Sequence, residues 1–313
     1  MDKKKGRILL AVDGSDQSLE AVRYVGEVIS REQNEVVLFN VRTEVPESFL
    51  DLEKNPEMHA KIVQVSAWAS QQKKIVNEFM EKALLILNSA GFPKQKVKVK
   101  IQKKKTGIAR DIIAESKRDY SAVVLGRTGL SRVKDIIIGS VANKIVVKTK
   151  NVSVAIVGGK PETEKVLVAF DGSEGAMKCV DFTGSMFGHS DMEIMLCHVI
   201  RPLSIFQKEY GQIFSEDEEA VWMQSNMEKI RPAMEKAKNV LMDQGVGADR
   251  ISSQVITDTP SRALGIVEKA RADNFGTIMI GRRGLSRVEE FFIGRVSKKV
   301  INMTKKRTIW IVK

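Results

Sequence analysis

Short apolar runs alternate with longer amphipathic stretches along the whole chain. In the first half the apolar runs fall at residues 7–12, 35–41, 96–102, 121–126 and 152–157. Apolar residues at helical spacing fall at 16–32, 108–118 and 140–149, and a longer mixed segment, from about residue 47 to 89, becomes helical in pattern toward its end. Strands that alternate with helices predict a parallel sheet covered by helices on both faces.

The second half of the chain repeats this pattern. The sequence RILLAVDGSDQSLEAV, which begins at residue 7, returns as KVLVAFDGSEGAMKCV at residue 165. The sequence GRTGLSRVKDIIIG from Gly126 returns as GRRGLSRVEEFFIG from Gly281, with nine of fourteen positions identical. The two pairs of landmarks lie 158 and 155 positions apart, so the whole unit is duplicated with small insertions.

The duplication sets the predicted architecture. We expect an α/β protein of two tandem doubly wound domains, each with a five-stranded parallel sheet, over residues 1–158 and 163–313. A chain of 313 residues is long enough for two domains. The polar, glycine-containing stretch 158–165 is expected to link them.

Glycines cluster where ligands bind in such a fold, beyond the carboxyl ends of the strands. Asp13 follows the first strand and Gly126 the fourth, and neighbouring strands would bring both loops to one crevice. Gly126 and Gly129 would let the backbone approach a ligand closely. Gly139 and Ser140 open the next helix, whose free amides favour an anion, with Ser140 as N-cap or as a further donor. The pattern predicts a nucleotide site, although the chain has neither GxGxxG nor the Walker loop.

The same residues resemble a known family. LLAVDGS, GRTGLSR and GSVANKIV resemble the universal stress protein domain, and both halves match it along nearly their whole length. The resemblance implies the adenine nucleotide alpha hydrolase-like fold. It also implies ATP, or AMP or ADP, in members that carry G-2x-G-9x-G-S/T. The implied contacts in the first half are Asp13, Asn40 and Val41 near the adenine, Leu125, Gly126 and Gly129 at the ribose and phosphate, and Gly139, Ser140 and Val141 at the phosphates.

The second half departs from the motif at its last position. The corresponding residues are Asp171, Val199, Ile280, Gly281, Gly284, Gly294 and Arg295. Arg295 stands where the family has Ser or Thr. Two interpretations remain open, because an arginine can pair with phosphate through two hydrogen bonds or can fill the pocket with its bulk.

Acidic and basic residues near the motifs have structural alternatives. Asp13 and Asp171 are expected to accept hydrogen bonds from the next turn or the ligand, with Mg²⁺ coordination as the alternative. His198 ends the second strand of the second half, where the first half has Asn40, and we expect a crevice-lining residue there rather than a general base. With only two others, His59 and His189, histidine does not indicate a metal site. The recurring arginines are expected to be architectural or to line the phosphate rim: Arg127, Arg132, Arg282 and Arg287.

Net charge is +12, and the excess lies in residues 1–160, with 29 basic and 18 acidic residues. Lysines alternate with apolar residues over 94–105, which favours a charged edge strand over a nucleic-acid patch. We therefore expect no nucleic acid partner. The two cysteines, Cys179 and Cys197, are expected to be buried and reduced. With no long apolar run, we expect a cytoplasmic protein without a membrane partner.

Three classes of function are compatible with this pattern. The first is a regulatory, stress-response module that binds ATP, the second a slow ATPase, and the third an interaction scaffold with degenerate pockets. No base or positioned water for hydrolysis is identifiable, so we do not expect a dedicated enzyme.

Assembly is predicted from the last strand of each half. An unpaired edge strand is a liability, so we expect residues 152–157 to contact residues 308–312 in an intrachain pseudo-dimer, with association of two chains left open. Aromatic residues in the least similar segments, among them Trp68, Phe206, Phe214 and Trp222, are expected to pack over the crevice or an interface. A lid over the nucleotide is the alternative.

Overall fold

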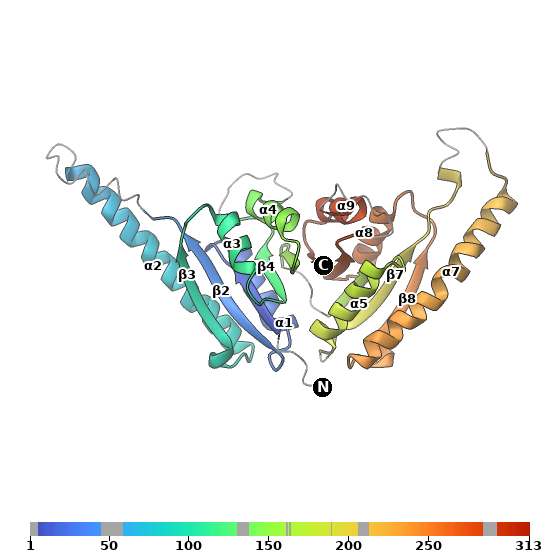
Figure 1. The fold of residues 1–313 in the computed structure, drawn as a ribbon, viewed down its shortest axis with the longest axis horizontal. Coiled ribbons are helices and arrows are strands. Elements are labelled where there is room, and N and C mark those ends of the chain that lie inside the picture. Colours follow the sequence, from blue (N-terminus) through green and yellow to red (C-terminus); the bar gives the residue numbers. More distant parts are fainter. Residues whose placement is uncertain are drawn as a thin grey trace.

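The structure is a computed structural model that describes residues 6–44, 59–129, 138–160, 162, 164–188, 190–205, 213–283 and 293–313. Ten strands of this described part form one continuous sheet in the order β3-β2-β1-β4-β5-β10-β9-β6-β7-β8 (Figure 1). The order is the same in both halves of the chain when read outward from the centre, so each half is a doubly wound α/β unit.

The N-terminal half contains the first five strands and the helices between them. Its strands are β1 (Gly6–Ala11), β2 (Asn34–Arg42), β3 (Val97–Lys103), β4 (Ala122–Gly126) and β5 (Ser153–Val157). Its helices are α1 (Asp16–Val28), α2 (His59–Ser89), the short 3₁₀ helix η3 (Lys94–Lys96), α3 (Ile108–Ser116) and α4 (Ser140–Lys148).

The C-terminal half repeats these elements. Its strands are β6 (Lys165–Ala169), β7 (Glu193–Val199), β8 (Ile251–Ile256), β9 (Thr277–Gly281) and β10 (Thr308–Val312). Its helices are α5 (Glu174–Phe187), α7 (Glu216–Asp243), the short 3₁₀ helix η4 (Ala248–Arg250), α8 (Arg262–Ala272) and α9 (Arg295–Met303).

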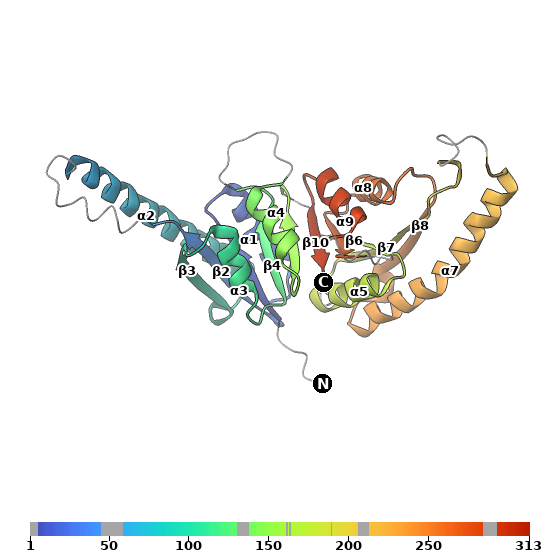
Figure 2. The same ribbon diagram turned by 45° about the horizontal axis from the view of Figure 1, so that its top comes forward.

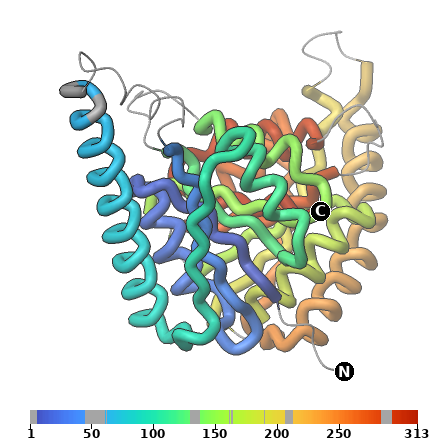
Figure 3. The backbone as a smooth tube through the Cα atoms, turned by 60° about the vertical axis from the view of Figure 1, so that its left-hand side comes forward, coloured from blue at the N-terminus to red at the C-terminus, as the bar shows by residue number. Residues whose placement is uncertain are grey.

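Apolar residues on successive strand positions explain the layers. Leu9 and Leu10 of β1 point to opposite faces of the sheet and are both fully buried. One core contains Leu10 and residues of α1, α2, α5 and α7, and the other contains Leu9 and residues of α3, α4, α8 and α9. Helices therefore cover both faces, and each core continues from one half into the other (Figure 2). Figure 3 shows α2 beside β3 at the outer end of the N-terminal half, and α1 packs against α2 nearer the junction.

The two halves join through their last strands. β5 pairs with β10 antiparallel, with Ile156 opposite Ile309 and Val154 opposite Ile311, whereas all other pairings within the described sheet are parallel. The predicted contact between residues 152–157 and 308–312 is confirmed. Because each strand covers the other's open edge, neither is exposed to a further sheet.

A buried hydrogen-bonded chain crosses this junction. The indole Nε1 of Trp310, in β10, donates to the hydroxyl of Tyr24 in α1 at 2.9 Å, and that hydroxyl lies 2.9 Å from Thr277 Oγ1. The Trp310 ring is fully buried against Phe182 and Phe187, with centroid separations of 5.6 and 6.2 Å. The buried Tyr24 hydroxyl of the N-terminal half thus forms its hydrogen bonds with Trp310 and Thr277 of the C-terminal half.

The two sheet edges are the strands β3 and β8. β3 carries the exposed lysines of the 94–105 stretch, so its predicted place at an edge is confirmed. Lys98 forms an ion pair with Glu35 and Lys100 with Glu115. The interpretation of the lysines as edge protection therefore agrees with the topology.

Cys179 and Cys197 are buried and are not bonded to each other, as predicted. Among the helices that the structure describes, none combines the length and hydropathy that crossing a membrane requires. The helix predicted at 16–32 is shorter than expected, because α1 ends at Val28 and Ile29 caps it in an extended conformation.

Candidate functional site

The loops after β1 and β4 meet at one place, because these strands are neighbours with Ala11 beside Leu125. Gly129 lies so close to the first loop that a Cβ there would be 2.3 Å from Asp13 Oδ2. A Cβ at Gly126 would be 2.8 Å from the main-chain oxygen of Gln17, in the first turn of α1. A side chain at Gly126 would therefore clash with the backbone of α1, and one at Gly129 would displace the Asp13 carboxylate, so the predicted juxtaposition of the two loops is present.

The turn after β1 is held by its own side chains. Asp13 Oδ1 accepts from the Ser15 amide at 3.0 Å and from the Ser15 hydroxyl at 2.6 Å, and the Ser15 Oγ accepts from the Ser18 amide to cap α1. Gly14, between them, has a φ of 91°, which a residue with a side chain rarely adopts. The hydrogen-bonding role expected for Asp13 is present, and its other oxygen, Oδ2, lies beside Gly129.

The N-terminus of α4 lies against the same loop. Gly139 donates its amide to the Arg127 carbonyl at 2.8 Å, and a Cβ at Gly139 would lie 3.4 Å from Thr128 Cα. The prediction that Ser140 acts as N-cap is wrong: Gly139 is the N-cap residue, because the chain is still extended there. No side chain caps α4, and Ser140 is the exposed first residue of the helix. The first amides of α4 are thus not used by a side-chain cap.

The outer part of the site is formed by the end of β2. Asn40, 6% exposed, donates from Nδ2 to the Val12 carbonyl at 2.9 Å, which ties β2 to the turn after β1. Its Oδ1 is buried and has no hydrogen-bond partner among the described residues. Val41 and Leu125 are also buried, so the walls at the strand ends are mainly apolar.

The C-terminal half builds the same arrangement. Ser173 donates its amide to Asp171 Oδ1 at 3.1 Å, and Gly294 donates to the Arg282 carbonyl at 2.8 Å as N-cap of α9. Gly281 is tightly packed, since a Cβ there would lie 3.0 Å from the Gly175 oxygen. Val199 and Ile280 are buried at their strand ends. Arg295, the first residue of α9, is exposed, and Gly284 lies outside the described residues.

His198 takes the place of Asn40 in the C-terminal half. Its Nδ1 lies 2.8 Å from the Phe170 carbonyl, the contact that Asn40 makes with the Val12 carbonyl. Burial lowers the pKa of His198, and the bond to Phe170 opposes this only in part. The expected role as a crevice-lining residue agrees with this geometry. His59 begins α2 and His189 lies outside the described residues.

We expect His198 to make stability depend on pH. The pKa of His198 is lower in the folded chain than in the unfolded chain. As the pH falls below about 6.5, the unfolded chain therefore binds a proton at His198 before the folded chain does, and the free energy of unfolding decreases. His198→Asn, which copies the contact of Asn40, should reduce that decrease. Urea unfolding at about pH 7.5 and about pH 5.5 measures the difference for both proteins. An equal difference in the two proteins would show that His198 does not contribute.

Two arginines of the glycine loops cross between the halves. Arg127, which follows Gly126, donates from Nη1 to the Ile301 carbonyl in α9 at 3.0 Å, and Arg282, which follows Gly281, donates to the Val146 carbonyl in α4 at 2.8 Å. Both arginines are buried, and burial lowers the pKa of each to about 10, so both remain charged at neutral pH. Of the two roles predicted for them, the architectural one is present. Arg132 and Arg287 lie outside the described residues.

One contact of the site was not predicted. Gln17 lies against Gly126 through its main chain, and its side-chain oxygen accepts from the Gly159 amide at 3.3 Å. Gln17 lies in the first turn of α1, just after Asp13 and Gly14, and this position in the sequence could have predicted that it lies near the fourth strand. The described residues hold no cluster of three or more His, Cys, Asp or Glu side chains suited to a metal ion.

The fold and the paired glycine loops define a tandem α/β protein with one loop site in each half, and comparison with known proteins identifies its family. The sequence profile of the Universal stress protein family matches residues 5–158 and again residues 162–313. The chain therefore belongs to the universal stress protein family and has its tandem two-domain form.

Individual relatives agree with this assignment. Universal stress protein YxiE of Bacillus subtilis (strain 168) is 27% identical over 142 residues, which are 45% of this chain and 93% of that protein. A universal stress protein from Archaeoglobus fulgidus DSM 4304 has a similar crystal structure, with a TM-score of 0.61 and 20% identity over 99% of both chains. A functionally unknown protein from Pseudomonas aeruginosa PAO1 gives a TM-score of 0.54 and 14% identity, over 98% of this chain and 92% of that one. These two structures share the fold.

Proposed function

We propose that the N-terminal half binds an adenine nucleotide, ATP or its products ADP and AMP, and that the protein is a regulatory module of the stress response in the cytoplasm. The observation that carries the proposal is the contact of three backbone segments at one point. Gly129 touches Asp13, and the N-cap Gly139 lies against the loop that contains Gly129. Amides at the start of α4 and the absence of side chains on the loop together suit a phosphate chain.

Each residue of the proposed site has a role in this arrangement. The base would lie against Asn40 and Val41, where a buried acceptor and an apolar wall meet. The ribose and first phosphate would lie at Leu125, Gly126 and Gly129 beside Asp13, and the remaining phosphates at Gly139, Ser140 and Val141. A magnesium ion accompanying the phosphates would be held by phosphate oxygens and the Asp13 carboxylate.

The C-terminal half is proposed as the weaker site. It keeps Asp171, Gly281 and Gly294 in the same arrangement, but Arg295 replaces the serine at the start of the helix. We propose that the bulk of the Arg295 side chain takes the place that the phosphates would have in the N-terminal half. We therefore expect one occupied pocket in the natural chain.

Replacing Arg295 with serine tests this difference. The number of ATP molecules bound per chain should about double, because the variant restores the motif that the N-terminal half carries. Isothermal titration calorimetry measures this number, with Ser140→Arg as the matched variant that should remove binding from the N-terminal half. Unchanged binding in Arg295→Ser would show that Arg295 does not control occupancy.

Direct assays separate this proposal from its alternatives. Mass spectrometry of small molecules retained by the purified protein should detect an adenine nucleotide, and saturating ATP at 100 times its dissociation constant should stabilise the fold by about 2.7 kcal/mol. Sustained release of phosphate that Asp13→Ala abolishes would indicate an ATPase. Absence of retained nucleotide and of stabilisation would favour a scaffold with degenerate pockets.

A further inference from the structure

Two long helices extend beyond the body of the molecule. In α2 the first buried side chain is Phe79, and in α7 it is Ile230, at 8% and 7% exposure. No earlier residue of either helix whose side chain is described is buried. We call residues 59–78 the α2 arm and residues 216–229 the α7 arm. Figure 1 and Figure 2 show the arms at opposite ends of the molecule, α2 at the left and α7 at the right, and in Figure 1 both point upward and outward.

The arms expose large apolar side chains. On the α2 arm Val63 is 56% and Trp68 is 50% exposed, and on the α7 arm Val221 is 70% and Trp222 is 42% exposed. Of the two places expected for Trp68 and Trp222, over the crevice or at an interface, these exposures favour an interface. Phe214 is partly buried, and Phe206 lies outside the described residues. Helices in water draw most of their stability from packing of an apolar face, so uncovered arms of this length indicate a partner.

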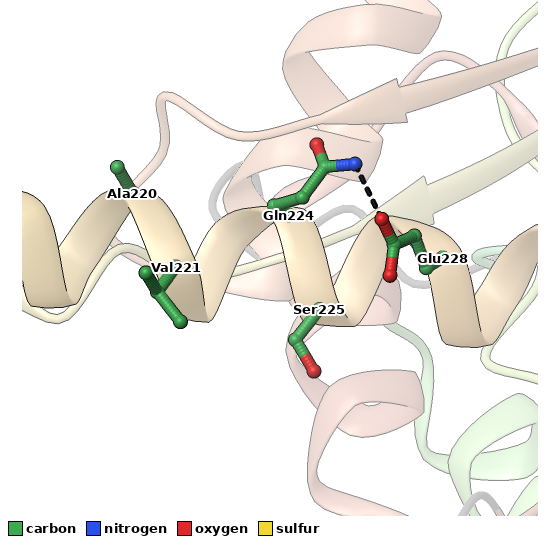
Figure 4. A pocket seen from close by; sticks show the side chains of 5 residues that line it. All are labelled: Ala220, Val221, Gln224, Ser225 and Glu228. Atoms are coloured by element: carbon green, nitrogen blue, oxygen red, sulfur yellow. Dashed lines mark hydrogen bonds between the residues drawn. The ribbon is translucent and has the colours of Figure 1, made fainter.

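A shallow pocket marks the α7 arm. It is lined by Ala220, Val221, Gln224, Ser225 and Glu228, all on one helix, and Gln224 donates to Glu228 at 2.6 Å (Figure 4). The pocket is distant in sequence from the glycine loops of both halves. An open, partly apolar helix face of this kind suits another helix better than a small molecule.

The two arms carry opposite charge. The α2 arm has Lys61, Lys73 and Lys74, and its first acidic residue is Glu78 at its last position. The α7 arm has Glu216, Asp217, Glu218, Glu219 and Glu228 before its first basic residue, Lys229, at its end. Trp68 and Trp222 lie 154 positions apart, close to the spacing of the repeat, so they occupy corresponding places on arms of opposite sign.

We propose that a second copy of this chain covers the arms, with the α2 arm of each copy packed against the α7 arm of the other. This inference goes beyond the proposed nucleotide binding and does not depend on it. A twofold axis perpendicular to the view of Figure 1, above the molecule, turns the second copy upside down and brings α2 to α7 at both ends. A horizontal twofold axis in the plane of that view would instead bring like arms together and oppose like charges. The charges select the first arrangement.

Charge reversal in the full-length protein tests this arrangement. One variant carries Lys73→Glu and Lys74→Glu, which changes the net charge of the α2 arm from +2 to −2. A second carries Glu216→Lys, Asp217→Lys and Glu228→Lys, which changes the net charge of the α7 arm from −4 to +2. A third, the combined variant, carries all of these changes. Sedimentation at low salt should show a dimer of the natural chain that weakens as salt is added. Each of the first two variants should raise the dissociation constant at least about tenfold, because the paired arms become like-charged at each end. The combined variant should recover dimerisation to within about threefold, since it restores opposite charges.

The control variant is Lys104→Glu with Lys105→Glu, which makes the same change of charge as the first variant on exposed residues after β3, outside the arms. It should dimerise as the natural chain does. Circular dichroism should show that all variants keep their helix content. A natural chain that stays monomeric at low salt, a variant of either arm that dimerises normally, or a combined variant that fails to recover would each overturn the proposal.

Discussion

Replacing Trp310 with alanine is expected to lower the free energy of unfolding by about 3–5 kcal/mol. The ring is fully buried at the junction of the two halves, against Phe182 and Phe187, and alanine would leave a cavity there. The change also removes the donor to Tyr24, whose hydroxyl is buried on the other half of the chain. Urea unfolding followed by circular dichroism measures the loss.

Two milder variants separate packing from hydrogen bonding. Trp310→Phe keeps most of the apolar volume and Tyr24→Phe removes the hydroxyl, so each should lower stability by less than the alanine variant, with about 1 kcal/mol from each lost hydrogen bond. If Trp310→Ala lowers stability by less than about 1 kcal/mol, the junction is not tightly packed.

Replacing Gly139 with valine is expected to weaken ATP binding about 100-fold, which corresponds to about 2.8 kcal/mol. The backbone at Gly139 accepts a side chain, but its Cβ would lie 3.2 Å from the Arg127 oxygen and 3.4 Å from Thr128 Cα. The methyl groups of valine would then occupy the space between the loop and the first amides of α4. Isothermal titration calorimetry measures the affinity.

Gly294→Val is the matched control, because a Cβ there meets the corresponding atoms, 3.3 Å from the Arg282 oxygen and 3.7 Å from Arg283 Cα. It should disturb the C-terminal half to a similar degree and leave ATP affinity nearly unchanged. Equal loss in both variants, or in neither, would contradict the assignment of the site to the N-terminal half. Melting temperatures of both proteins show whether folding is affected.

Much of the architecture could be predicted from the sequence, because each element predicted in one half could be compared with the corresponding element of the other half. The adjacency of β1 and β4 followed from requiring that Asp13 and Gly126 face one crevice, and the pairing of β5 with β10 followed from the need to cover two edges. The exchange of Asn40 for His198 at matching positions was also visible from the alignment of the halves.

The errors have local physical causes. Ser140 looked like a cap because serine favours that position, but the chain becomes helical one residue after Gly139, so the glycine itself is the cap. The place of Trp68 and Trp222 was left open between the crevice and an interface, because sequence hydrophobicity does not distinguish a side chain packed within the chain from one exposed on a helix. The Trp310 and Tyr24 contact was not predictable, since their positions are far apart and only the paired sheets bring them together.

The crossed arginines have a mechanical consequence. Arg127 belongs to the glycine loop of one half and bonds to a carbonyl in the last turns of α9, while Arg282 does the reverse with α4. α4 and α9 are also the helices whose first residues face the two glycine loops. A displacement of either loop must therefore pull on a helix belonging to the opposite pocket or break a buried bond, so cutting the chain in two would remove a linkage that no single half can supply.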